Sequence, residues 1–237
     1  MIILGIESST PVASVAVVSG EGLLGEITLN VGLTHSEQLL PMVDDVLKQT
    51  RIPLTNINGI AVAGGPGSFT GLRIGMATAK GLAQGRNIPL VGIPTLRALA
   101  YTQAGFQGLV SPVLNARRGE VYTSLFNFSD KEGQLDKEEQ LIEDQAIDPL
   151  TWAQTLKKKG GPVVFVGDGV GPYRDIWRET LGAFALLPPP VSMLPRASTV
   201  AWLGRERLLR NETDDLFGLK PFYIRPVEAK VKSQAAR

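Results

Sequence analysis

The chain has 237 residues, with 24 lysines and arginines against 23 aspartates and glutamates, and it contains no cysteine. The lack of cysteine excludes a disulfide framework, a zinc–thiolate or iron–sulfur site and a thiol nucleophile. The even charge balance excludes a basic nucleic-acid-binding surface spread over the whole molecule, so any RNA contact is expected to be local or made by a partner.

The N-terminal segment has no basic region, and Glu7 interrupts its apolar run, so we expect no signal peptide. The sequence also lacks an apolar run of about 18 residues, the length that a membrane-spanning helix needs. These features predict a cytoplasmic protein that makes no membrane contact.

The first half of the chain alternates short apolar runs with segments of helical periodicity. Strands are expected at 2–6, 13–18, 23–29, 60–63 and 90–93, and helices at about 34–49, 70–84 and 95–102. The first helix opens on a capping box from Thr34 to Glu37, and Pro41 inside it is expected to cause a kink.

The second half repeats this pattern. A hairpin is expected from strands 109–115 and 120–128, with Gly119 in a left-handed position at its turn. Asp148 and Pro149 predict a helix start, with the helix running to about residue 158. A strand at 163–166 and helices at 172–181 and from Ser198 onward follow, and the segment after residue 227 is expected to be solvated.

Two segments, 60–69 and 163–173, share one design: four apolar residues, a glycine turn and an aromatic residue that enters a helix. This similarity predicts a duplicated α/β lobe, with hairpins and βα units forming a mixed sheet flanked by helices. We expect one lobe at 1–104 and a shorter one, with the tail, at 105–237. The helix at 198–211 could pack on the first lobe.

The glycine-rich segment 64–75, GGPGSFTGLRIG, could contact an anion, because a glycine turn that opens a helix presents backbone N–H groups. Gly65, Gly67 and Ser68 would make this contact. The segment is neither a P-loop, since no Gly-Lys-Ser/Thr follows, nor a dinucleotide fingerprint, since Thr70 replaces the third glycine. A tight strand-to-helix turn without a ligand remains the alternative.

Small residues form one stripe of the helix that this turn opens. The stripe consists of Gly71, Gly75, Ala79 and Ala83, spaced four residues apart. Each interior glycine costs about 1 kcal/mol relative to alanine, so the stripe predicts the close approach of another backbone. That backbone could belong to this chain or to another subunit.

Glu7, Ser8 and Ser9 lie where the first strand turns, and Asp168 lies in the second glycine turn. The two carboxylates could hold a metal-bound phosphate across a cleft, as Mg²⁺ with ATP or ADP requires, or they could serve only their own turns. Arg117 at the hairpin tip could bind phosphate or remain solvated.

The single histidine, His35, does not predict a metal site, because Leu39 stands one helical turn further on. A serine-protease constellation is not expected either. Ser68 would need glycines at positions 66 and 70, which are Pro66 and Thr70.

Six segments resemble those of the TsaB family: IESSTPVASVAV, THSEQLLP, AGGPGSFTGLRIG, NARRGEVY, VGDG and PFYIRP. They occur in order over nearly the whole chain. The resemblance implies an actin-like fold of the sugar kinase and actin superfamily, with two ribonuclease-H-like lobes. It also implies a non-catalytic role beside TsaD, a larger paralogue that transfers threonylcarbamoyl from its adenylate to N6 of adenosine 37 in tRNA. TsaE, an ATPase, is the third member of that system.

Catalytic TsaD carries a His-x-x-x-His metal motif, of which this chain keeps only the first histidine. The resemblance implies heterodimer pairing through the helices at 34–49 and 70–84, with a homodimer on the same surface when the chain is alone. The interface residues expected from it are Leu39, Leu40, Val43, Gly71, Gly75, Ala79 and Ala83. Any nucleotide with Mg²⁺ would then sit at the partner interface.

Two departures from the family pattern weaken an expectation of Mg-nucleotide chemistry: Glu7 and Asn115 stand where relatives often carry aspartate. The alternative function is a small actin-fold ATPase or phosphotransferase acting alone. Direct tRNA contact through Arg117, Arg118 and the 230–237 tail is a further option that the near-zero net charge disfavours.

Overall fold

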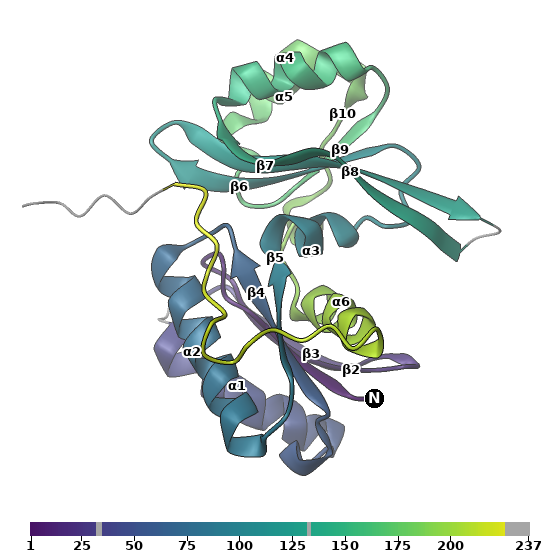
Figure 1. Cartoon of the computed structure of the whole chain (residues 1–237). Coiled ribbons are helices and arrows are strands. Elements are labelled where there is room, and N and C mark those ends of the chain that lie inside the picture. Colours follow the sequence, from purple (N-terminus) through teal and green to yellow (C-terminus); the bar gives the residue numbers. More distant parts are fainter. Residues whose placement is uncertain (32–34, 132–133, 226–237) are drawn as a thin grey trace, which may run out of the picture.

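The computed structural model describes residues 1–31, 35–131 and 134–225. Its first sheet has the strand order β3-β2-β1-β4-β5 (Figure 1). The strands are β1 (Ile3–Glu7), β2 (Ala13–Ser19), β3 (Gly22–Leu29), β4 (Gly59–Gly65) and β5 (Leu90–Pro94). β1 runs antiparallel to β2 and parallel to β4, so hairpin and βα connections share one mixed sheet, as predicted.

Helices cover both faces of this sheet. α1 (His35–Thr50) and α2 (Phe69–Arg86) share a core with the face that includes Leu4 and Val62. α3 (Thr95–Tyr101) and α6 (Ala197–Leu209) pack on the other face. A short 3-10 helix, η1 (Leu54–Asn56), precedes β4.

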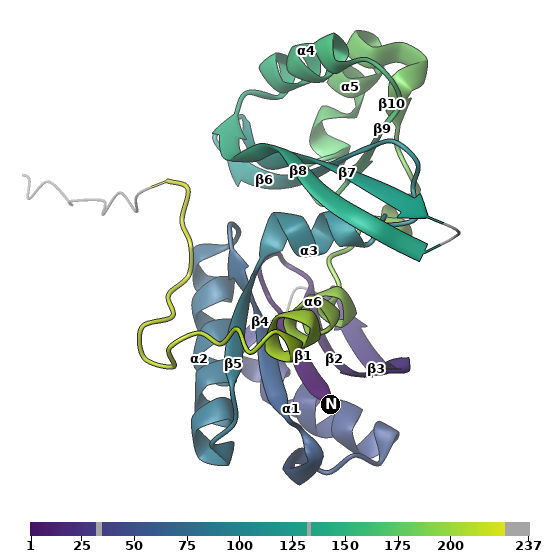
Figure 2. The same cartoon turned by 45° about the vertical axis from the view of Figure 1, so that its right-hand side comes forward.

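The second sheet has the order β10-β9-β6-β7-β8. Its strands are β6 (Leu109–Arg117), β7 (Glu120–Lys131), β8 (Gln134–Ile147), β9 (Val163–Val166) and β10 (Ala185–Leu186). α4 (Pro149–Lys159) and α5 (Arg174–Leu181) cover one face, and α3 packs on the other, so α3 lies between the two sheets (Figures 1 and 2). The remaining 3-10 helices are η2 (Gly171–Tyr173), η3 (Gly182–Phe184) and η4 (Pro190–Ser192).

Most predicted elements are confirmed within a few residues. Asp148 caps α4 through a 2.9 Å bond from the Thr151 N–H, and Gly119 has a φ of 80°. The cap at Ser198 is wrong: α6 begins at Ala197, and the Ser198 hydroxyl instead donates to Glu26 at 2.9 Å. β8 was not expected, because its charged sequence lacks an apolar alternation. Thr34 and the segment after residue 225 lie outside the described residues.

The last described residues, 213–225, return to the first sheet. We call residues 213–225 the strap. The Asp214 N–H donates to Leu90 O at 3.0 Å, and its carboxylate receives the Gly92 N–H at 2.7 Å and the Arg207 guanidinium. The Phe222 N–H then bonds Gly64 O at 2.7 Å. α6 and the strap therefore lie on the first sheet, and the lobe boundary at residue 104 stays a prediction.

α6 approaches the first sheet closely at two glycines. A Cβ on Gly204 would lie 2.3 Å from the Cβ of Ala61, and one on Gly5 would lie 2.4 Å from Ala197 O. The expected effect of Gly204→Leu is a loss of about 3 kcal/mol in the free energy of unfolding, because the helix must move off the sheet.

Urea denaturation measures this loss, with Gly85→Ala as the control. A Cβ on Gly85 would meet nothing within 4 Å, so alanine there is expected to be neutral or to stabilise α2 by up to about 1 kcal/mol. Equal midpoints for wild type and Gly204→Leu would contradict the close packing of α6.

Candidate functional site

A cavity of about 580 Å³ lies between the two lobes. The first turn and the glycine turn form one wall, and the β6–β7 hairpin with the second glycine turn forms the other. Five of the expected phosphate contacts line it: Ser9, Gly67, Ser68, Arg117 and Asp168. Ser68 is the N-cap of α2 and accepts the Gly71 N–H at 3.2 Å. The structure therefore brings most of the anticipated contacts to one cleft, and their binding of nucleotide stays a prediction.

Glu7 does not line this cavity. Its side chain is 1% exposed, and its Oε1 accepts the Ser9 N–H at 2.6 Å. Burial raises the pKa of Glu7 from 4.5 to about 7. The expected pairing of Glu7 with Asp168 across the cleft is therefore not found, because the first carboxyl lies beneath the cavity wall. Gly65 also lies elsewhere, in a cavity of about 390 Å³ beside the strap.

The second wall of the cleft is held by backbone contacts. The Asp168 carboxylate accepts the Asn115 N–H at 3.0 Å, and the Asn115 side chain accepts the Arg117 N–H at 2.8 Å. Arg117 has a φ of 61°, in the left-handed region. Asp168 and Arg117 thus place one carboxylate and one guanidinium on this wall. The carboxylate already accepts a hydrogen bond from the hairpin backbone.

His35 is engaged within the fold. Its Nε2 lies 2.8 Å from Thr10 O, and the ring is 9% exposed. Leu39 is in the hydrophobic core. In the described part of the chain, no group of three or more His, Cys, Asp or Glu side chains is arranged to hold a metal ion.

The small-residue stripe of α2 faces this chain's own first turn. A Cβ on Gly71 would lie 2.1 Å from Ser8 O, and one on Gly75 would lie 2.1 Å from Ser8 Oγ. The Ser8 hydroxyl also donates to Gly71 O at 2.9 Å. The intramolecular alternative therefore describes the stripe. A bulky residue at Gly75 would displace Ser8, so it would test folding and not pairing.

The other residues expected at a partner interface fall into a buried set and one exposed residue. Ala79, Ala83, Leu39 and Val43 are buried in the core of the first lobe. Leu40 is 55% exposed. We correct the expected interface accordingly: a partner can reach Leu40 and the groove that Val43 helps to line, whereas the small stripe has its neighbour within the chain.

A second set of small residues points outward from α2. Ala77, Gly81 and Gly85 are exposed, and a Cβ on Gly81 or Gly85 would meet nothing within 4 Å. Their spacing of four residues repeats that of the buried stripe, two positions further on. The spacing of this second row is therefore visible in the sequence. Only the structure shows that the second row, and not the first, faces solvent.

An apolar groove of about 550 Å³ adjoins these residues on the α1 side. Its apolar lining consists of Leu40, Val43, Leu47, Ile52, Pro53, Leu54 and Leu82. Three charged residues also line it: Asp44 and Lys48, which pair with each other, and Arg51. We call the groove, together with Ala77, Gly81 and Gly85, the outer face. It offers an apolar surface with few charges, which is the composition of the centre of a protein–protein interface.

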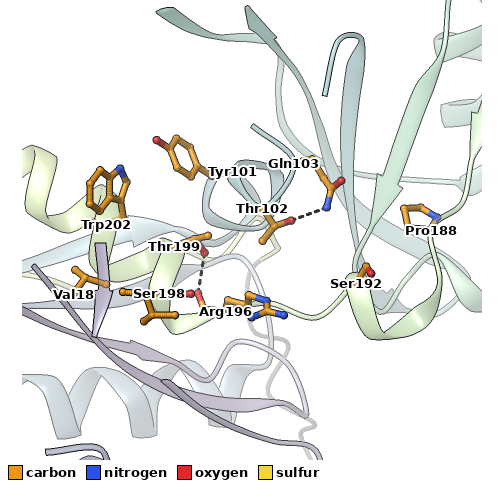
Figure 3. Close-up of a pocket in the computed structure, with 11 residues that line it drawn as sticks. Val18, Tyr101, Thr102, Gln103, Pro188, Ser192, Arg196, Ser198, Thr199 and Trp202 are labelled. Carbon is orange, nitrogen blue, oxygen red and sulfur yellow. Dashed lines mark hydrogen bonds between the residues drawn. The ribbon is translucent and has the colours of Figure 1, made fainter. Parts of the chain in front are cut away.

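A further cavity of about 700 Å³ lies between α3, α6 and the segment before α6 (Figure 3). Tyr101, Trp202 and Arg196 line it. Several of its polar groups already have partners: Thr199 donates to Arg196 O at 2.9 Å, and Arg196 pairs with Glu26 at 3.2 Å. None of the predicted site residues lines this cavity.

No helix in the described part of the chain has the length and apolar character needed to cross a membrane. A family model described as "TsaD: tRNA N6-adenosine threonylcarbamoyltransferase" matches residues 26–233. The TsaB protein of Bacillus subtilis is 34% identical over 232 residues, covering 98% of this chain and 97% of that protein. The TsaB protein of Escherichia coli is 34% identical over 208 residues, with coverages of 83% and 86%.

Solved structures agree with these relatives. A Pseudomonas aeruginosa protein described as similar to peptidase YeaZ superposes with a TM-score of 0.77 at 26% identity, covering 94% of this chain and 99% of that chain. An Arthrobacter polyphosphate/ATP-glucomannokinase gives 0.51 at 12% identity, with coverages of 88% and 99%. The second likeness concerns the fold alone, and it confirms the predicted actin-like, sugar-kinase architecture.

Burial of Glu7 predicts a pH-dependent stability. Its pKa of about 7 in the folded state exceeds the ordinary 4.5, so the folded state holds the proton more tightly. The resulting stabilisation is complete below pH 4.5 and is lost as the pH rises through 7. Glu7→Gln keeps the acceptor for the Ser9 N–H without the charge.

At pH 8 the Glu7→Gln variant is therefore expected to be more stable than wild type, by up to about 3 kcal/mol. At pH 4 the two proteins are expected to be equal. Urea denaturation at both pH values measures the difference, and a difference that does not change with pH would contradict the burial of this carboxyl.

Proposed function

The chain belongs to the TsaB family of tRNA threonylcarbamoyladenosine biosynthesis proteins, and from this membership we propose that it is the non-catalytic partner subunit of a TsaD-type transferase. Its part in the biosynthesis of this modified nucleoside follows from the family. The proposal adds that the chain binds the transferase as a heterodimer and activates threonylcarbamoyl transfer to N6 of adenosine 37. TsaE and tRNA would be reached through that complex, and the same surface would form a homodimer when the chain is alone.

The outer face is the observation that carries this proposal. Leu40 is exposed beside an apolar groove. We call the neighbouring exposed row of Ala77, Gly81 and Gly85 the crest of α2, and it has open space above Gly81 and Gly85. A helix of another protein could approach α2 closely there, because no side chain stands between the two backbones. Its apolar side chains would fill the groove, which would bury Leu40 and Leu82.

The cleft supports a role without chemistry of its own. Glu7 lies beneath the cavity wall, the His35 ring is bonded to Thr10, and Asp168 is bound to the hairpin backbone. An actin-fold ATPase acting alone would need two acidic side chains facing a metal-bound phosphate. Asp168 lines the cavity, but Glu7, the acid of the first lobe, does not. ATP turnover by the purified chain that Asp168→Asn abolishes would contradict the non-catalytic role.

Activation by a partner needs a differential affinity. If the chain binds the transfer-competent conformation of the transferase more tightly than the incompetent one, binding shifts the population toward the competent state. A preference of about tenfold corresponds to about 1.4 kcal/mol. The rigid attachment of α2 to the first turn suits this role, because the presented surface is ordered before binding.

Two substitutions test the outer face. Leu40→Glu places a charge at the groove, and Gly81→Leu fills the open space above the crest without touching this chain. Each is expected to raise the Kd for the TsaD-type subunit at least tenfold without lowering the melting temperature, which Gly81→Leu should raise because leucine favours the helix over glycine.

Isothermal titration calorimetry with the purified transferase measures this Kd. Leu150→Glu is the matched control, since Leu150 is 46% exposed on α4 of the second lobe. If both outer-face variants bind as tightly as wild type and this control, the partner uses another surface.

A further inference from the structure

Most of the strap is held by the first lobe. The Asp214 carboxylate receives a backbone N–H of β5 at 2.7 Å. The Phe222 N–H donates to Gly64 O, near the end of β4, at 2.7 Å. The Tyr223 ring lies against Phe69 of α2, with ring centroids 5.2 Å apart. These contacts attach the strap to two strands and one helix of the first lobe.

The end of the strap reaches the second lobe. Arg225, the last residue of the strap, pairs with Glu120, the first residue of β7. Their side chains are 28% and 39% exposed, so both are partly shielded from solvent. Lys220 and Phe222 also line the cavity of about 390 Å³, and residues of β8 line it with them. The strap therefore pairs with β7 and shares a cavity with β8.

The covalent connections between the lobes run elsewhere. The chain enters the second lobe after α3, through residues 102–108, and returns before α6, through residues 187–196. Both segments contribute to the cavity of Figure 3. The strap instead follows α2 (Figures 1 and 2), where Arg73 donates to the Tyr223 hydroxyl at 3.2 Å. It is thus a third link between the lobes, separate from the two covalent ones.

α3 is the element about which the lobes could turn. Its Ala98 packs in the core on the first sheet, whereas its Leu96 and Leu99 pack in the core on the second. A helix between two packed layers permits small rotations, because its side chains slide within their contacts. A link away from this helix limits such a rotation, since its two ends separate when the lobes turn.

We propose that the strap is a latch between the two lobes, with the Arg225–Glu120 pair as its closing contact, and that it sets the opening of the cleft. Glu120 directly follows the tip of the β6–β7 hairpin, which brings Arg117 into the wall of the cleft. The pair therefore holds this wall in place relative to the glycine turn of the first lobe. The latch does not depend on the function proposed above.

The exposure of the pair makes the latch reversible. Ion pairs that water reaches contribute little to stability, because solvent screens the attraction and the long side chains lose freedom. The rest of the strap is attached by buried backbone bonds and by the Tyr223 ring. Release of Arg225 alone would free the hairpin and let the cleft widen while the strap stays on the first lobe.

Distances between spin labels test the latch, since the chain has no cysteine of its own. The labels are attached to Gln84→Cys on α2 and to Gln154→Cys on α4, which are exposed positions on different lobes. Double electron–electron resonance of the labelled full chain is expected to give one narrow distance distribution. Arg225→Glu is expected to make this distribution at least twofold broader, because the closing contact becomes repulsive.

Exchanging the two charges provides the rescue. The variant with Arg225→Glu and Glu120→Arg restores the attraction in the opposite sense, and it is expected to return the narrow distribution. Arg174→Glu is the control, because it makes the same change of charge at an exposed position on α5. This control is expected to leave the distribution as in wild type.

Two results would overturn the inference. If Arg225→Glu gives the wild-type distribution, the lobes keep their positions without the latch. If Arg225→Glu broadens the distribution and the exchanged pair does not narrow it again, the effect does not act through Glu120. The partner-binding role is judged separately, by the Kd of the Leu40→Glu and Gly81→Leu variants, so each proposal can fail alone.

Discussion

The close approach of the first turn, at Ser8, to α2 determines how this helix is oriented on the first lobe. Ser8 O and Ser8 Oγ occupy the space where side chains of Gly71 and Gly75 would stand, so only glycine permits this contact. The contact holds the turn against the helix and buries the carboxyl of Glu7 under it. It also fixes the rotation of α2, which turns Ala77 and Gly81 toward solvent.

The cleft and the outer face, which we propose as the partner-binding surface, therefore share the helix α2. The N-cap of α2 lines the cleft, and its middle turns form the crest between the groove and the strap. The strap strengthens this arrangement, because Tyr223 and Phe222 attach it to the same helix and to the strand before it.

Local sequence signals predicted most elements, because capping residues, glycine turns and apolar periodicity act within a few residues of chain. Asp148 as a cap and the strand at Val163–Val166 are examples. The same signals failed where the decisive contact is distant. β8 is an edge strand that pairs with β7, and its many charged residues give no apolar alternation from which a strand could be predicted. Ser198 carries the signal of a cap, but its partner is Glu26, far away in sequence.

The site shows the same limit. Spacing identified the stripe of Gly71 and Gly75 as a place of close approach, but it could not say that the approaching backbone is Ser8. The outer face depends on which side of α2 remains free, and that is settled by packing alone. The PFYIRP motif drew attention to the strap, but its packing on the first lobe was not expected, because an extended segment has no periodicity and its position depends on contacts with Gly64 and Lys80.

Hydrogen–deuterium exchange of the chain, with and without the TsaD-type subunit, tests most directly whether α1 and α2 form the partner surface. The expected result is slower exchange in α1 and α2 on binding, while the β6–β7 hairpin and α4 exchange as in the free chain. Slowed exchange confined to the cleft or to the second lobe would contradict it.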